Sequence, residues 1–179
     1  GVKKELVDKP LSTKKFKFEA LQVLSYMSKN ILQIVDMKRV HDDANELLDI
    51  ANHIFKAKGN WMHIVSFAEM EALACGIHLG AEAIVVDERA TRMLVEDSTD
   101  LFSYMEHKLH TKMQVDRKNL AKFKKMTRGL RFIRSTELVL MAYELGLLDK
   151  YLPDIPEPKK QLLQAALWGV KLNGCAVSQ

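Results

Sequence analysis

The stretch AIVVDERATR, residues 83–92, decides the fold that the sequence predicts. Its first four residues are apolar, and Asp87, Glu88 and Arg89 follow them at once. A short apolar run that contains β-branched residues and ends abruptly on charges is typical of a buried strand. We therefore expect a strand that ends at a polar site and places the carboxylate of Asp87 there.

The residues on both sides of this strand predict helices. Upstream, Ser66-x-x-Glu69 is a capping pattern, and the alanine-rich run after it predicts a helix over 65–81. Downstream, ATRMLVED predicts another helix. Near the start of the chain, ILQIVD (31–36) predicts an earlier strand, and the residues over 39–59 predict a helix that ends at its glycine. This alternation favours a parallel α/β sheet with crossover helices.

The length and the helical periods of the chain indicate one domain with an extension. The chain has 179 residues, of which 47% are apolar, so it can bury a sizeable core. Residues 1–30 have a helical period, and from residue 100 onward helical periods predominate. We therefore expect an α/β domain over 1–100 and, over 101–179, a helical C-terminal extension with a basic segment that packs on the domain.

Charge and cysteine content favour a cytoplasmic setting without a membrane anchor. The two cysteines, Cys75 and Cys175, lie far apart and form no CxxC pair, which is typical of a reducing compartment. The chain opens on GVKKELVDK, where charges replace the apolar core of a signal peptide. Nowhere do 18 apolar residues follow one another without a charge, so no membrane span is expected.

Two acids from neighbouring elements are candidates for a metal site. Asp87 lies at the carboxyl end of the predicted strand, and Glu69 lies in the first turn of the preceding helix. Ligands gather at such ends in parallel sheets, and a divalent cation relieves the repulsion between two carboxylates. The alternative is purely structural: Glu69 completes the capping box, and Asp87 caps the helix near Ala90 or pairs with an arginine such as Arg92.

The stretch SFAEMEALACGIHLGAEAIVVDERATRML resembles the second half of a PIN domain, the fold of toxin ribonucleases and of enzymes that process ribosomal RNA. The features that carry the likeness are Glu69 with Glu71 and Ala72, the turn Leu79-Gly80-Ala81, and the strand that ends on Asp87. Less specifically, FIRSTELVLMAYELGLL and ALWGVKLNGCAVS resemble the extension of an archaeal PIN subgroup.

The resemblance implies a three-layer PIN-like parallel sheet flanked by helices, and a metal-dependent endonuclease that acts on single-stranded RNA or ribosomal RNA. It implies Mg²⁺ or Mn²⁺ as cofactor, Glu69 and Asp87 as metal-binding catalytic acids, and Glu88 as a further metal ligand, with Glu71 as a supporting acid. Two features depart from the family. PIN domains open on an apolar strand that carries the first metal-binding Asp, but Asp8 lies in a polar stretch, so we expect that strand upstream of Gly1. The acid that usually follows the later strand is also missing, because Thr91 and Arg92 occupy those positions.

A second candidate site is the basic segment RKNLAKFKKMTRGLRFIR, residues 117–134, which has eight cations and no acid. Its candidate nucleic-acid-binding residues are Arg117, Lys118, Lys122, Lys125, Arg128, Arg131 and Arg134, and Lys124 lies among them. Such a surface attracts phosphates and releases counterions on binding. The alternative is a solvated face on which lysine stems cover apolar surface.

Three functions therefore stay open from the sequence: a PIN-type ribonuclease, a non-catalytic RNA-binding or scaffold protein, and a protein-interaction module whose basic helix meets an acidic partner. A homodimer is a further expectation. The pair His107 and His110 lacks the additional ligands that a zinc site needs. The sequence contains neither GxGxxG nor a Walker motif, so it offers no support for a dinucleotide or nucleoside triphosphate site.

Overall fold

The structure is a computed structural model that describes residues 2–35, 37–172 and 175. The described residues form two compact units. Unit 1 lies within 1–81 and 111–127, and unit 2 lies within 82–110 and 128–179. The domain boundary expected near residue 100 falls inside helix α6 (Ser98–Leu109), and the chain passes between the two units three times.

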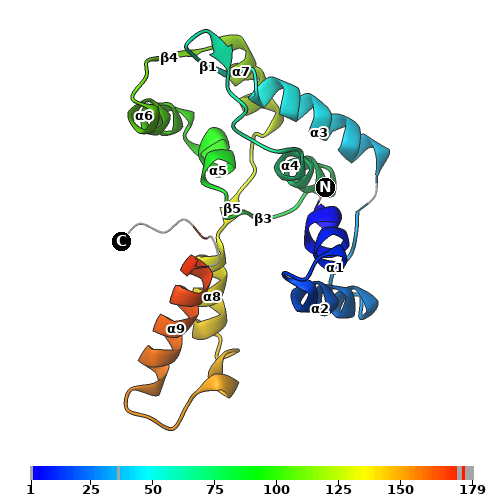
Figure 1. Cartoon of the computed structure of the whole chain (residues 1–179), viewed down its shortest axis with the longest axis vertical. Coiled ribbons are helices and arrows are strands. Elements are labelled where there is room, and N and C mark those ends of the chain that lie inside the picture. The colour runs from blue at the N-terminus through cyan, green and yellow to red at the C-terminus, as the bar shows by residue number, and fades with distance from the viewer. Residues whose placement is uncertain (1, 36, 173–174, 176–179) are drawn as a thin grey trace. The chain divides into compact units, whose positions relative to one another are not determined.

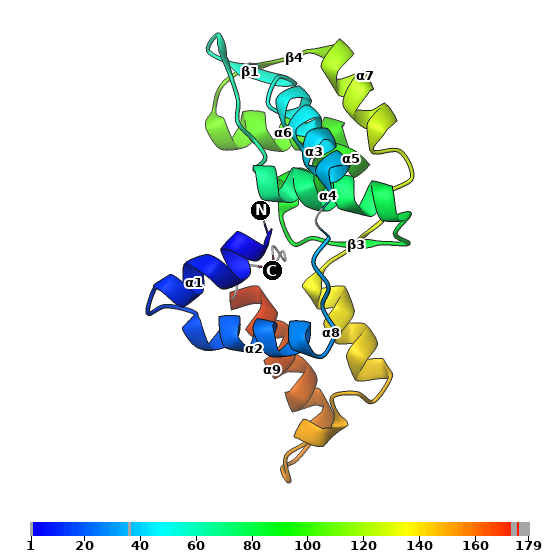
Figure 2. The same cartoon turned by 90° about the vertical axis from the view of Figure 1, so that its right-hand side faces the viewer.

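Unit 1 begins with short helices, as the sequence predicts for residues 1–30. These are η1 (Lys4–Asp8), α1 (Lys9–Ser12) and α2 (Lys17–Ser28), and α1 and α2 lie side by side (Figure 2). The strand predicted over 31–36 is wrong for residues 31–35, which form no strand, and Asp36 lies outside the described residues. The backbone N–H groups of Ile31 and Leu32 instead donate to the carbonyl of Tyr26 at the end of α2.

Helices α3 (Lys38–Ala51) and α4 (Phe67–Leu79) form the centre of unit 1, where they pack against each other (Figure 2). The apolar face of α3 repeats at helical spacing and is buried, and α4 contributes small residues that allow close packing. The buried positions are Val40, Ala44, Leu47, Ile50 and Ala51 on α3 and Ala68, Met70, Leu73, Ala74 and Gly76 on α4. Helix α7 (Arg117–Met126) packs on α3 as well.

A small antiparallel sheet completes unit 1, and the sequence did not predict it. Its strands are β1 (Phe55–Ala57), β2 (Asn60–Trp61) and β4 (Met113–Val115), in the order β2-β1-β4. The helix predicted over 39–59 ends at Ala51. Lys58 (φ 50°) and Gly59 (φ 83°) instead form the two-residue turn between β1 and β2, where both central residues need a positive φ.

Unit 2 contains the strand that the sequence predicted best. Strand β3 (Ile84–Val85) pairs in parallel with β5 (Phe132–Ile133), and α5 (Arg89–Glu96) follows β3 as expected. Helices α6 and α8 (Ser135–Glu144), the 3₁₀ turn η2 (Asp149–Tyr151) and α9 (Pro158–Leu172) complete the unit, and α8 lies beside α9 (Figure 1). The sequence CAVS (175–178) could add a short strand, but only Cys175 of it lies within the described residues.

The fold class is therefore α/β, as the sequence predicted, with small sheets and many helices. The helical character of residues 101–172 is confirmed, although β4 and β5 interrupt it. The three-layer PIN-like arrangement stays a prediction. Across the described part of the chain, no helix is long and apolar enough to cross a membrane.

Candidate functional site

Glu69, one of the two principal acids, is engaged at the N-terminus of α4. The backbone N–H of Ser66 donates to Oε2 of Glu69 at 2.8 Å, and the N–H of Glu69 donates to Oγ of Ser66 at 3.5 Å. This reciprocal pair is the capping box that the sequence predicts. The carboxylate and the Ser66 hydroxyl thus each satisfy one backbone donor at the start of the helix.

Asp87 follows β3 directly, as predicted, and caps a helix that is distant in sequence. The backbone N–H of Ser135 donates to Oδ1 of Asp87 at 2.8 Å, and the Ser135 hydroxyl donates to Oδ2 at 2.5 Å. Ser135 is the first residue of α8, where a negative charge also meets the positive end of the helix dipole. Cys175 forms a further hydrogen bond to the same carboxylate.

These contacts keep Asp87 ionised. Burial alone would raise the pKa of Asp87, but the hydrogen bonds from Ser135 and Cys175 and the nearby charge of Arg134 outweigh it and hold the pKa below its ordinary value. The carboxylate therefore stabilises the folded state as an anion. Its contribution is complete above the ordinary aspartate pKa and is lost as the pH falls through the lower pKa of the folded state.

The third acid, Glu88, is the N-cap of α5, and its Oε1 accepts a hydrogen bond from the N–H of Ala90 at 2.9 Å. All three predicted metal ligands thus have a capping role that explains their positions without a cation. Glu69 belongs to unit 1, whereas Asp87 and Glu88 belong to unit 2. Within residues 2–35, 37–172 and 175, no group of three or more His, Cys, Asp or Glu side chains is arranged to hold a metal ion. A capping hydrogen bond uses only one of the several lone pairs of a carboxylate, so these acids could still bind a cation. The binding of Mg²⁺ or Mn²⁺ therefore stays a prediction.

We predict that Asp87→Asn lowers the free energy of unfolding by about 1–2 kcal/mol at pH 7, because a neutral amide replaces the charged acceptor of the hydrogen bonds from Ser135 and Cys175. The difference between variant and wild type should shrink as the pH falls below about 4, where the wild-type carboxylate also loses its charge. Urea unfolding at pH 7 and pH 3, followed by circular dichroism, measures both values. Asp154→Asn, the same change at an exposed aspartate in the loop before α9, is the control and should change neither. An equal loss at the two pH values would contradict the capping role of the Asp87 charge.

The basic segment 117–134 is divided between the two units, and its cations are used differently. Helix α7, in unit 1, begins at Arg117 with Asp116 as its N-cap, and Oδ1 of Asp116 accepts from the N–H of Asn119 at 2.9 Å. The α7 cations are exposed: Arg117, Lys118, Lys122, Lys124 and Lys125. Of these, Lys122 forms an ion pair with Glu46 on α3, with Nζ 2.7 Å from Oε1.

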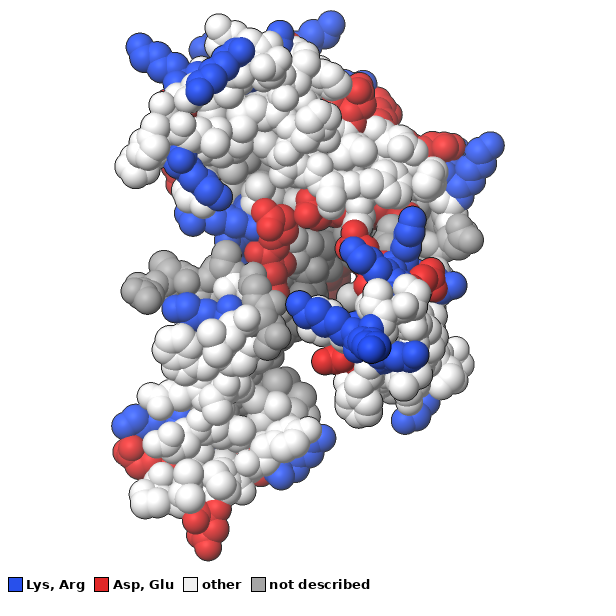
Figure 3. Space-filling model, viewed as in Figure 1, with Lys and Arg blue, Asp and Glu red and all other residues white. Residues whose placement is uncertain are grey.

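The other three arginines of the segment belong to unit 2. Arg128 and Arg131 are exposed, whereas Arg134 is partly buried and occupied by Glu137. The guanidinium of Arg134 donates to Oε1 of Glu137 through Nε (2.9 Å) and Nη2 (2.7 Å), and its backbone N–H donates to Oε2. These hydrogen bonds hold the pKa of Glu137 below its ordinary value. Arg134 thus occupies the N-cap position of α8, and the Glu137 carboxylate accepts from both its backbone N–H and its guanidinium. Figure 3 shows lysines and arginines with acids among them on the face in view.

A third group of polar and reactive side chains joins α3 and α4, and no local sequence pattern predicted it. His78 Nε2 lies 2.6 Å from Oδ2 of Asp43, and Cys75 is on the same face of α4, three residues before His78. Burial raises the pKa of the Cys75 thiol, and the charge of Glu71 raises it further. A raised pKa keeps the thiol protonated, which opposes a role as nucleophile.

The chain matches no protein-family model, no curated protein and no solved structure. The resemblance to PIN domains, the homodimer and the cytoplasmic setting therefore stay predictions.

The sequence missed the partners of the predicted site residues. Ser135 was not marked as a partner of Asp87, and the hydrogen bond between them joins positions 48 residues apart. Glu46 was likewise unmarked as the partner of Lys122. No local pattern identifies such pairs, because each joins elements that meet only after folding.

Proposed function

We propose that this protein binds single-stranded RNA through the outward face of α7. Four cations carry the proposal: Arg117, Lys118, Lys124 and Lys125. At 3.6 residues per turn they occupy roughly one third of the helix circumference and extend about 12 Å along the axis. Each is exposed, and the ten residues of α7 include no acid.

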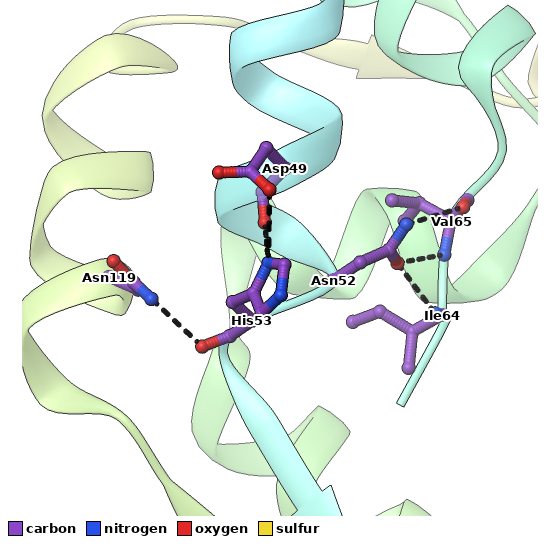
Figure 4. Close-up of polar contacts among 6 residues, drawn as sticks. All are labelled: Asp49, Asn52, His53, Ile64, Val65 and Asn119. Carbon is purple, nitrogen blue, oxygen red and sulfur yellow. Dashed lines mark hydrogen bonds and ion pairs between the residues drawn. The ribbon is translucent and has the colours of Figure 1, made fainter. Parts of the chain in front are cut away.

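The opposite side of α7 holds these cations in place. Phe123 is fully buried, and the hydroxyl of Thr127 donates to its carbonyl oxygen at 2.9 Å. Asn119 donates through Nδ2 to the carbonyl oxygen of His53 at 3.0 Å, which joins the first turn of α7 to the end of α3 (Figure 4). The basic face therefore lies on a helix fixed by both apolar and polar contacts, so the backbone that carries its charges needs little ordering when they bind phosphates.

The ligand class follows from the charge pattern. A row of cations without acids attracts the phosphate backbone, and the guanidinium of Arg117 can contact a phosphate through two hydrogen bonds. A single strand can adapt its phosphate spacing to a short helix, and single-stranded or ribosomal RNA is also the substrate that the PIN resemblance implies. Glu69, Asp87 and Glu88 already act as helix caps. This favours a protein that binds RNA without cleaving it.

We predict that neutralising the face, as Arg117→Gln, Lys118→Gln, Lys124→Gln and Lys125→Gln together, weakens RNA binding and flattens its salt dependence. Each lost phosphate contact should reduce the slope of log K against log salt by about 0.7, so the four changes should reduce it by about 2–3. Fluorescence anisotropy with a labelled single-stranded RNA between 50 and 300 mM salt gives the slope.

The matched control is Lys122→Gln, since Lys122 already pairs with Glu46 and should contribute less. Lys38→Gln, an exposed lysine of α3 in the same unit, is a second control. If the fourfold variant keeps the wild-type slope, the proposal fails. If RNA does not bind but an acidic protein partner does, with the same salt dependence, the interaction-module alternative replaces it.

A second candidate function is the metal-dependent endonuclease with a three-layer PIN-like fold. The observation that favours it is an ionised carboxylate, Asp87, at the carboxyl end of a parallel strand pair. In that function the two predicted ligands of unit 2, Asp87 and Glu88, would hold Mg²⁺ or Mn²⁺, which supplies an activated water for phosphodiester hydrolysis. Cleavage of a labelled single strand with Mn²⁺, compared between wild type and Asp87→Asn, decides between the two functions.

A further inference from the structure

The segment Lys14–Phe18, sequence KKFKF, presents two phenylalanine rings to solvent between lysines. Phe16 is 53% exposed and Phe18 is 69% exposed. Lys14, Lys15 and Lys17 are exposed as well, and Nζ of Lys15 lies 4.7 Å from the centre of the Phe16 ring. Alternating cations and aromatic rings within five residues form a surface that differs in kind from the purely basic face of α7.

The backbone at Phe16 makes this exposure unusual. Phe16 precedes α2 with φ 62° and ψ 18°, in the left-handed region, and its side chain makes no capping hydrogen bond. An aromatic residue is strained there, and glycine or asparagine is the ordinary choice. Because the ring is more than half exposed, burial repays little of this strain, so packing within the chain does not explain a phenylalanine at this position.

We propose that the KKFKF segment is a second contact for single-stranded RNA, in which Phe16 and Phe18 stack on bases and the lysines meet phosphates. Stacking on aromatic rings tolerates any base, and neighbouring cations hold the backbone beside the stacked bases. The ligand, single-stranded RNA, is the same as in the proposed function, and this inference rests on the proposed function for that choice of ligand. The residues are different, and they lie in α2 and the turn before it.

The exposed face of α2 favours RNA over a lipid surface. A helix that lies in a membrane interface needs a continuous apolar face. On α2 the exposed apolar residues Leu21 and Tyr26 are separated by exposed Gln22 and Ser25, and Glu19 is exposed beside Phe18. The apolar surface is thus broken by polar groups, whereas the two rings at the start of the helix remain accessible one by one.

The double variant Phe16→Leu and Phe18→Leu tests the proposal, because leucine keeps apolar surface but cannot stack. We expect at least about tenfold weaker binding of a labelled single-stranded RNA, since one base stack corresponds to roughly 5–150-fold in affinity. The salt slope should stay at the wild-type value, because no charge changes. Tyr151→Leu is the matched control: Tyr151 is 61% exposed under Lys150, at 5.0 Å, and should not affect binding.

Phe16→Gly separates a binding role from a structural one. Glycine adopts the positive φ without strain, so the melting temperature should not fall while RNA binding weakens. A lower melting temperature together with weaker binding would assign the ring a structural role and overturn the proposal. So would wild-type RNA affinity in the double leucine variant, or binding of wild type to vesicles with anionic lipids but not to RNA.

The results also separate this inference from the proposed function. If the double leucine variant binds weakly while the fourfold α7 variant keeps the wild-type salt slope, the KKFKF contact stands and the α7 site fails. If only the α7 variant loses affinity and slope, the proposed function stands and the KKFKF contact is overturned.

Discussion

Phe123→Ala is expected to lower the free energy of unfolding by about 3–5 kcal/mol, the range measured for large aromatic residues removed from protein cores. Phe123 is fully buried on the inner side of α7, where the helix packs on α3. Alanine removes most of the ring and leaves a cavity that rigid neighbours fill only in part. Equilibrium unfolding in urea, followed by circular dichroism, measures the loss.

Lys124→Ala is the control for this prediction, because Lys124 is the next residue of the same helix and is exposed. Its effect should stay within about 0.5 kcal/mol, as for most surface changes. The same pair also tests how α7 works. Phe123→Ala should weaken RNA binding through loss of the helix, whereas Lys124→Ala should do so through charge alone. A loss below about 1 kcal/mol for Phe123→Ala would contradict the packing described here.

Asn52→Ala is expected to lower the free energy of unfolding by about 2–3 kcal/mol, because it leaves buried backbone groups without partners. Asn52 is buried, and its Oδ1 accepts from the N–H groups of Ile64 (2.9 Å) and Val65 (3.4 Å) (Figure 4). Its Nδ2 donates to the carbonyl oxygen of Val65 at 3.5 Å. A single side chain thus joins the end of α3 to the segment that leads into α4.

Asn52→Asp refines the test, because it keeps the shape and one acceptor but replaces the amide donor with a charged oxygen. The buried charge would face the carbonyl oxygen of Val65, so the loss should equal or exceed that of Asn52→Ala. Asn45→Ala is the matched control, since Asn45 is an exposed asparagine of the same helix that bonds only within one helical turn. If Asn45→Ala and Asn52→Ala lowered the free energy of unfolding equally, the hydrogen bonds of Asn52 would not be the cause of the loss.

Helix starts were predictable because their signals are local. The pattern Ser66-x-x-Glu69 needs only the first turn of α4, and the structure contains that capping box. The strand at residues 84–85 was predictable for a related reason, since an apolar run bounded by charges signals its own ends. The functional interpretation of Glu69 and Asp87 went further than these signals, because a capping acid and a metal-binding acid have the same local sequence.

The errors occurred where distant partners decide the backbone. ILQIVD has strand propensity, but residues 31–35 lack a neighbouring strand and form none. The residues over 55–57 have a helical apolar pattern, yet they pair with 113–115 as β1 and β4. A strand needs a partner to satisfy its backbone hydrogen bonds, and no local propensity supplies that partner.

The amino-acid sequence by itself determined the α/β class, the starts of several helices with the capping box of α4, and the dense positive charge over 117–134. Each of these depends on neighbours within a few residues, through backbone propensity, periodicity or net charge. Only the tertiary structure decided that Asp87 caps α8 through Ser135, that Glu46 pairs with Lys122, and that Asn52 ties α3 to the segment before α4. Those outcomes depend on which donor comes within about 3 Å of which acceptor, and that proximity exists only once the chain is packed.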